Sequence, residues 1–292
     1  MLWRQWSALG IQSHIRRTDF PIDIEALLIS TFKIAPNDKR LFHAMLEWLE
    51  INRSFVSLSR IKSILKVFTP ESADKQYFKY TDLLIQILKE GSFKSDMIQD
   101  NTDHPYYEIL REYSRRSIVQ EMPFNNNQLI QLKLRGIFGV NARADIILYL
   151  LSERKQNANK IAKEIYYDQK IVHRVLKNWE MSEFVRGERS ANEILYSLNN
   201  QSLLRGVGRA KNRGYIDHPF VFFTLGRIVS VFHSHELQDD PYLISSRLRA
   251  FYRDIEKLAN YVGLKLGNEA NYPGEELLFS LQKKIPEIIV EF

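Results

Sequence analysis

Residues 138–198 constrain the fold more than any other part of the chain, because three helical patterns in a row are followed by two strand patterns. Asn141 can cap the first helix, since its short side-chain oxygen accepts a hydrogen bond from a backbone N–H of the first turn. The apolar residues of this helix recur at helical spacing and are Ile146, Ile147, Leu150 and Leu151. Asn157 or Asn159 can cap a second, shorter helix, whose apolar residues are Ile161, Ala162 and Ile165.

The third helix has two chemically different faces. Asp168 is its expected cap, after a turn at Tyr166 and Tyr167, and the helix is predicted from Gln169 to Glu180. Its apolar face holds Val172, Val175, Leu176 and Trp179, and its polar face holds Gln169, Lys170, His173, Arg174 and Lys177. Amide and guanidinium groups pair with base edges in the major groove, and Lys neutralises phosphate. The polar face is therefore interpreted either as a DNA contact or as an ordinary solvated surface.

A β-hairpin is predicted directly after the third helix. Its strands are Phe184–Arg186 and Ile194–Leu198, with a tip from Gly187 to Glu193. Arg186 and Arg189 lie on this hairpin. Their long cationic side chains are suited to contact a DNA backbone or minor groove.

Residues 138–198 resemble the winged helix-turn-helix transcription regulators. The likeness rests on Ala162-x-x-Ile165, the polar start Asp168-Gln169-Lys170, the inward Val172 and Leu176, and the exit Phe184-Val185 into a Gly-containing hairpin. It implies duplex DNA as partner, a recognition helix in the major groove, a hairpin wing and a homodimer. Such domains often have Gly in the turn and at the exit of the recognition helix, where this chain has Tyr166-Tyr167 and Glu183. Because a left-handed Glu costs about 1 kcal/mol, the exit corner is expected to be built differently.

Basic residues are concentrated around the same stretch. Residues 133–213 contain 16 Lys or Arg against 8 Asp or Glu, a net charge of +8, whereas the whole chain carries only +6 and the remainder therefore −2. A basic segment of this kind is typical of a nucleic-acid footprint. A second, Gly-containing basic loop, for which phosphate contact and simple solvation are equally open, holds Arg205, Arg209, Lys211 and Arg213.

The chain as a whole is predicted to be mainly α. We expect a helical N-terminal domain at 1–120, a linker at 121–132, the winged helix-turn-helix at 133–200 and a helical C-terminal region at 201–292. Expected caps in the first domain are Asp23, Asp38 and Ser57 or Ser59, and Thr69-Pro70 opens a further helix. The C-terminal region is predicted to contain helices at 219–232, 243–264 and 274–284, followed by an extended tail at 288–290.

Composition excludes several classes of site and compartment. The chain has no Cys, so it has no disulfides, thiolate catalysis or Cys-ligated metal centres, which fits a cytoplasmic protein. The first residues lack the continuous apolar core of a secretory signal. The most apolar run, at 219–232, is interrupted by Arg227 and is too short to cross a bilayer, so no membrane association is predicted.

Neither a metal site nor a catalytic site is predicted. The only local cluster of ligand types is His233, His235, Glu236, Asp239 and Asp240. It follows an apparent helix, and residues two apart on a helix point about 200° apart, so no metal and no cofactor are expected. The nucleophile elbow, the Walker loop and the His-Glu-x-x-His pair are all absent.

Three functional hypotheses follow. The first is sequence-specific binding of duplex DNA by a transcriptional regulator, whose flanking helices mediate dimerisation or sense a protein or small-molecule effector. The second is a protein-interaction module, of a docking or toxin-neutralising type, built on a winged helix without catalytic activity. The third is an enzyme whose catalytic residues are scattered in the sequence and leave no short motif.

Overall fold

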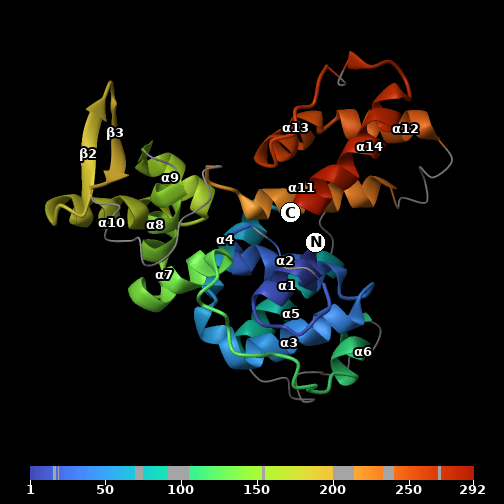
Figure 1. Cartoon of the computed structure of the whole chain (residues 1–292), viewed down its shortest axis with the longest axis horizontal. Coiled ribbons are helices and arrows are strands. Elements are labelled where there is room, and N and C mark those ends of the chain that lie inside the picture. The colour runs from blue at the N-terminus through green and yellow to red at the C-terminus, as the bar shows by residue number, and fades with distance from the viewer. Residues whose placement is uncertain are drawn as a thin grey trace. The chain divides into compact units, whose positions relative to one another are not determined.

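The computed structural model is mainly helical and contains one small antiparallel sheet (Figure 1). It describes residues 1–292 except 16, 17, 19, 70–74, 91–104, 153–154, 200–213, 233–239 and 269–270, and the side chains of 75–80 and 105 are not described either. The chain divides into two compact units, Leu2–Tyr215 and Ile216–Phe292, the second joined by Met1.

The first unit begins with helices packed around an aromatic core. These are α1 (Leu2–Ala8), α2 (Ile24–Ile34), α3 (Lys39–Asn52), the 3-10 turn η1 (Arg53–Phe55), α4 (Leu58–Val67), α5 (Lys75–Glu90) and α6 (Pro105–Arg111). Three predicted caps are confirmed: Asp23 accepts from Ala26 N at 3.1 Å, Asp38 from Leu41 N at 2.9 Å and Ser57 from Arg60 N at 3.3 Å. The rings of Trp6 and Trp48 meet edge-on at 5.6 Å. The predicted start at Thr69-Pro70 falls partly outside the described residues.

Residues 121–132 are not a free linker between domains. Met122, Leu129 and Ile130 are buried, and the Gln131 side chain accepts a hydrogen bond from Ile24 N at 3.1 Å. The 3-10 turn η3 (Asn127–Leu129) leads straight into α7 (Ile130–Phe138). The first compact unit therefore continues through this segment to Tyr215.

Three further helices and a hairpin follow α7. They are α8 (Ala142–Ser152), α9 (Ala158–Ile165), α10 (Gln169–Met181), β2 (Val185–Ser190) and β3 (Glu193–Leu198). The expected caps Asn141, Asn157 and Asp168 accept backbone N–H groups at 2.9, 2.8 and 2.8 Å. Their apolar stripes form one buried cluster that includes Ile146, Leu150, Ile161, Val172, Leu176 and Tyr196.

The sheet differs from the predicted hairpin in two ways. A short strand that sequence reasoning missed, β1 (Gln156–Asn157), pairs with β3, so the strand order is β1-β3-β2. The strands also run further than expected: Gly187 pairs with Tyr196 and Ser190 with Glu193. The tip is therefore only Ala191 and Asn192 instead of Gly187–Glu193.

The expectation of a differently built corner at Glu183 is wrong. Tyr166 and Glu183 both adopt left-handed backbone conformations, with φ of 61° and 58°. Tyr166 lies in the turn before α10 and Glu183 follows the end of α10, two positions at which winged helix-turn-helix domains often have glycine. The surrounding hydrogen bonds hold the strained backbone in place, as from Phe184 N to Trp179 O at 2.9 Å.

The second unit contains α11 (His218–Phe232), α12 (Pro241–Arg249), α13 (Tyr252–Tyr261) and α14 (Glu276–Glu291). The single long helix predicted at 243–264 is interrupted at Ala250 and Phe251. The predicted end before Pro286 and the extended tail at 288–290 are also wrong. The helix α14 continues past Pro286 because Ile285 and Ile288 extend its buried stripe. Within the described residues, none of the helices has the length and apolar character needed to span a bilayer.

Candidate nucleic-acid interface

The helix α10 separates its residues into a buried and an exposed face. Val172, Val175 and Leu176 pack into the core, and Trp179 meets Phe184 edge-on at a ring distance of 5.2 Å. The opposite face is exposed and consists of the five predicted residues Gln169, Lys170, His173, Arg174 and Lys177. Among the described residues, no ion pair or hydrogen bond engages these five side chains. Their donors are therefore free to meet an anionic partner.

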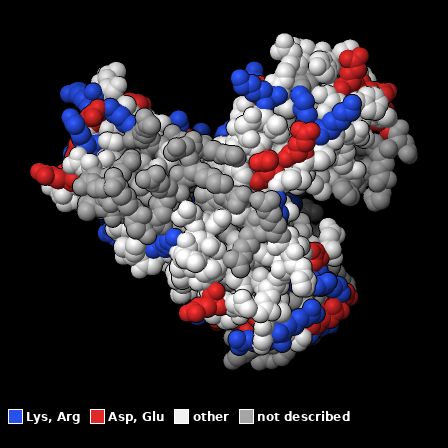
Figure 2. Space-filling view, in the orientation of Figure 1, with Lys and Arg blue, Asp and Glu red and all other residues white. Residues whose placement is uncertain are grey.

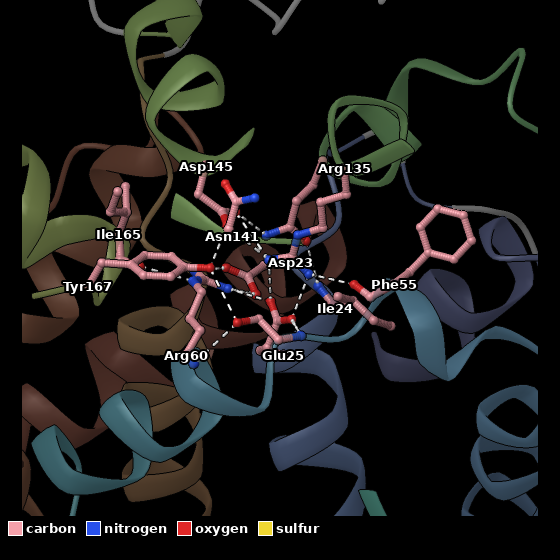
Figure 3. A network of polar contacts seen from close by, with 12 residues as sticks. Asp23, Ile24, Glu25, Phe55, Arg60, Arg135, Asn141, Asp145, Ile165 and Tyr167 are labelled. Atoms are coloured by element: carbon pink, nitrogen blue, oxygen red, sulfur yellow. Dashed lines mark hydrogen bonds and ion pairs between the residues drawn. The ribbon is translucent and has the colours of Figure 1, made fainter. Parts of the chain in front are cut away.

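A buried charge network lies next to the turn between α9 and α10, where it contacts Ile165 and Tyr167 (Figure 3). We define it as Asp23, Glu25, Arg60, Arg135 and Asp145, all at most 5% exposed. It joins α2 and its cap, α4, α7 and α8, so it connects the N-terminal helices to the helices that carry the candidate interface. The sequence predicted only Asp23, as a helix cap, and gave no sign of the network itself.

Arg135 holds one side of the network. Its guanidinium donates to both carboxylate oxygens of Glu25 at 2.6 and 2.8 Å and to Asp145 at 3.2 and 3.1 Å. Burial by itself lowers the pKa of Arg135, but the charges of Asp145 and Glu25 outweigh it and raise the pKa above its usual value. Gln131 adds a hydrogen bond to Asp145 at 2.8 Å. Arg135 therefore stays charged and its two terminal nitrogens are engaged, whereas its Nε has no hydrogen-bond partner within the described residues.

Arg60 holds the other side. It donates to Asp23 at 2.7 and 2.5 Å and to Glu25 at 2.7 Å. Its Nε donates to the carbonyl oxygen of Ile165 at 2.9 Å. Ile165 is the last residue of α9. Burial opposes its charge, but Asp23 in particular raises the pKa of Arg60 well above its usual value. Arg60 thus links α4 directly to the turn that precedes α10.

Tyr167 attaches this turn to the network. Its hydroxyl donates to Asp145 Oδ2 at 3.0 Å and lies 3.3 Å from Ser57 Oγ. Burial, reinforced by Asp145, raises the pKa of Tyr167 well above its usual value. The next residue is Asp168, whose carboxylate caps α10. The position of the first turn of α10 is therefore set by groups on α4 and α8.

The hairpin carries the two remaining predicted residues of this interface. Arg186 and Arg189 are both exposed, and Figure 2 shows Lys and Arg gathered over β2 and β3. The Nε of Arg186 lies 3.5 Å from Glu188 Oε1. Glu188 also forms an ion pair with Lys155, whose hydrogen bond and charge lower the pKa of Glu188. Arg189 has no ion pair within the described part of the chain, so it is the cation of the hairpin most available to a partner.

The structure refines the charge count of residues 133–213. Arg135 and Asp145 are buried in the network and contribute nothing to the surface. Further exposed cations of this region are Arg143, Lys155, Lys160 and Lys163. The basic loop with Arg205, Arg209, Lys211 and Arg213 lies outside the described residues. The exposed charge is thus mainly basic on α9 and α10, whereas the hairpin carries Arg186 and Arg189 beside Glu188 and Glu193.

Most of the remaining candidate residues lie outside the described part of the chain. His233, His235, Glu236 and Asp239 lie outside the described residues, and Asp240 caps α12 by accepting from Tyr242 N at 2.9 Å. Across the part of the chain that is described, no His, Asp or Glu cluster is arranged to hold a metal ion.

Comparisons with known proteins identify no relative. No protein-family model matches the chain, and neither the curated proteins nor the solved structures contain a significant match.

Proposed function

We propose that residues 130–198 form a winged helix-turn-helix that binds duplex DNA, as part of a transcriptional regulator. In this proposal α10 enters the major groove and the β2–β3 hairpin is the wing. The observation that carries the proposal is the exposed face of Gln169, Lys170, His173, Arg174 and Lys177 opposite a fully packed apolar face. These are residue types that contact base edges and phosphates.

Two further features support this assignment. Asp168 caps the N-terminus of α10, and the preceding Tyr167 donates to Asp145, so the start of the helix is held in place, as groove recognition requires. Arg189 extends the basic surface onto the hairpin. In a homodimer, two such helices would read half-sites about one helical turn apart.

The test is a gel shift with mixed genomic duplexes at low and high salt. For the wild-type chain we expect binding that weakens steeply with salt, by about 0.9 log units per log unit of salt for each phosphate contacted. The triple variant K170Q/R174Q/K177Q should bind at least about tenfold more weakly, which corresponds to roughly 1.4 kcal/mol. Arg174→Ala should relax sequence preference, whereas Lys177→Ala should weaken all sequences alike.

A matched control removes three exposed cations elsewhere. Lys62 and Lys66 lie on α4 and Arg253 lies on α13, and all three are exposed. The variant K62Q/K66Q/R253Q has the same net charge as the triple variant of α10 but keeps the proposed interface. Equal losses in the two variants would attribute binding to overall charge and remove the recognition-helix proposal.

One observation favours a protein partner as the second candidate function. Ile171 and Met181 on α10 are 40% and 73% exposed, and such apolar groups suit a docking surface. Absence of DNA binding at low salt would favour this docking function over the regulator.

A further inference from the structure

A cavity of about 810 Å³ lies in the N-terminal helical part of the first unit. Its walls come from α1, the segment after it, the start of α3 and residues 116–120. The volume is within the range of small-molecule sites. No residue of the candidate nucleic-acid interface lines it, so it is a separate feature of the molecule.

Two segments that are far apart in the sequence contact each other at the wall of the cavity. Ile11 forms a β-bridge with Val119, and Gln120 N donates to Gly10 O at 2.9 Å. Gly10 has a φ of +98°, and an added Cβ would lie 2.8 Å from Gln120 O. Trp6 anchors α1 by donating to Thr31 Oγ1 at 2.8 Å. The cavity is therefore shaped by fixed backbone and not by side-chain packing alone.

The charges that line the cavity are unequally engaged. The Asp38 carboxylate accepts from Trp3 Nε1 at 2.9 Å and from Leu41 N at 2.9 Å. The guanidinium groups of Arg40 and Arg116 have no ion pair or hydrogen bond among the described residues. Only the backbone N–H of Arg116 is engaged, donating to Glu47 Oε2 at 2.8 Å. Two guanidinium groups that have no partner among the described residues thus border the cavity, and Asp38, the one acid among its described lining residues, already accepts two hydrogen bonds.

We propose that this cavity binds a small organic acid with one carboxylate and an apolar body. Arg40 and Arg116 would hold the carboxylate, because guanidinium pairs with it bidentately. Trp3, Ile11 and Ile118 supply the apolar wall for the rest of the ligand. The site makes the N-terminal helices a sensor of small anions, and it stands whether or not α10 binds DNA.

The experiment uses the full chain and three probes: benzoate, uncharged benzamide of the same shape, and inorganic phosphate. Binding is measured by isothermal titration calorimetry and by the quenching of tryptophan fluorescence. We expect saturable benzoate binding below about 10 mM. Benzamide should bind at least about tenfold more weakly, since it lacks the charge that the guanidinium groups recognise.

Variants separate the site from nonspecific anion binding. R40Q/R116Q should weaken benzoate binding at least about tenfold, whereas Arg111→Gln, which removes an exposed cation on α6 away from the cavity, should leave it unchanged. An unaltered melting curve of R40Q/R116Q shows that the variant folds. Equal benzoate binding by wild type and R40Q/R116Q, no saturable benzoate binding, or binding of phosphate without benzoate would each overturn the proposal.

Discussion

Two residues other than glycine, Tyr166 and Glu183, adopt a left-handed backbone conformation at the ends of α9 and α10. Tyr166 is buried and its ring lies 5.7 Å from that of Phe68, so packing supports its backbone conformation. The Glu183 side chain is exposed, and hydrogen bonds hold its backbone in place. One of them runs from the side-chain Nδ2 of Asn199 to the Glu183 carbonyl oxygen at 2.8 Å. The strain at Glu183 is therefore not compensated by burial of its own side chain.

Glu183→Gly should stabilise the first unit. Relief of the left-handed conformation gains about 1–2 kcal/mol, and the extra backbone entropy of Gly in the unfolded chain costs about 0.5–1 kcal/mol. We expect a net increase of roughly 0.5–1 kcal/mol in the free energy of unfolding, measured by denaturant titration.

The neighbouring Ser182 is the matched control. Its φ of −92° is ordinary, and its hydroxyl donates to Trp179 O at 3.2 Å. Ser182→Gly should therefore lower the free energy of unfolding. A stabilisation by Ser182→Gly equal to that by Glu183→Gly would refute the assignment of strain to Glu183.

The Tyr167 hydroxyl makes stability depend on alkaline pH. Its pKa in the folded protein is raised by burial and by Asp145, whereas it titrates near 10 when unfolded. Its contribution is therefore complete below about pH 10 and is lost as the pH rises further, because the unfolded chain releases the proton first.

Tyr167→Phe should flatten this alkaline loss. The free energy of unfolding, measured between about pH 8 and pH 11, should fall less steeply in the variant than in the wild type. At neutral pH the variant should be less stable by about 1–2 kcal/mol, since Asp145 loses a hydrogen bond. Parallel curves for the two proteins would show that Tyr167 does not titrate in this way.

At the scale of elements, the buried charge network connects α2, α4, α7 and α8. Replacing a whole buried network by apolar residues is often neutral, whereas removing one partner leaves an uncompensated charge. Glu25 accepts from both Arg60 and Arg135, so the two arginines share one carboxylate. Removing either arginine therefore takes a donor from the acceptor of the other.

Arg135→Met should lower the free energy of unfolding by about 3–5 kcal/mol, because Glu25 and Asp145 would remain buried with too few donors. The exposed Arg174 provides the control, and Arg174→Met should change stability by no more than about 0.5 kcal/mol. Chemical denaturation followed by circular dichroism measures both. A loss below about 1 kcal/mol for Arg135→Met would mean that the network is not tightly coupled.

For the whole molecule, the unit Leu2–Tyr215 should fold without residues 216–292. A fragment 2–215 should unfold cooperatively in calorimetry. A fragment 127–199 should not, because it lacks Arg60 and Glu25 and exposes the surface that packs against α2 and α4. A cooperative transition of the fragment 127–199 at the temperature of the fragment 2–215 would contradict this view.

Local patterns determined much of the helical framework. Asn141, Asn157 and Asp168 act as caps because capping needs only a short acceptor next to the first turn. The exposed face of α10 is equally local, because helical periodicity places its polar residues on one side of the helix. The short strand β1 and the continuation of α14 past Pro286 were missed, because pairing with β3 and burial of Ile288 outweigh local preference.

The sequence by itself thus determined where most helices begin and which residues form the polar face of α10, since both depend on neighbours within one or two turns. Only the tertiary structure decided that Arg60, Arg135 and Asp145 are buried. Nothing in the sequence distinguishes these three residues from ordinary surface charges. Their partners lie up to 110 positions away along the chain. Burial of a charge depends on such distant partners, and no local pattern specifies them.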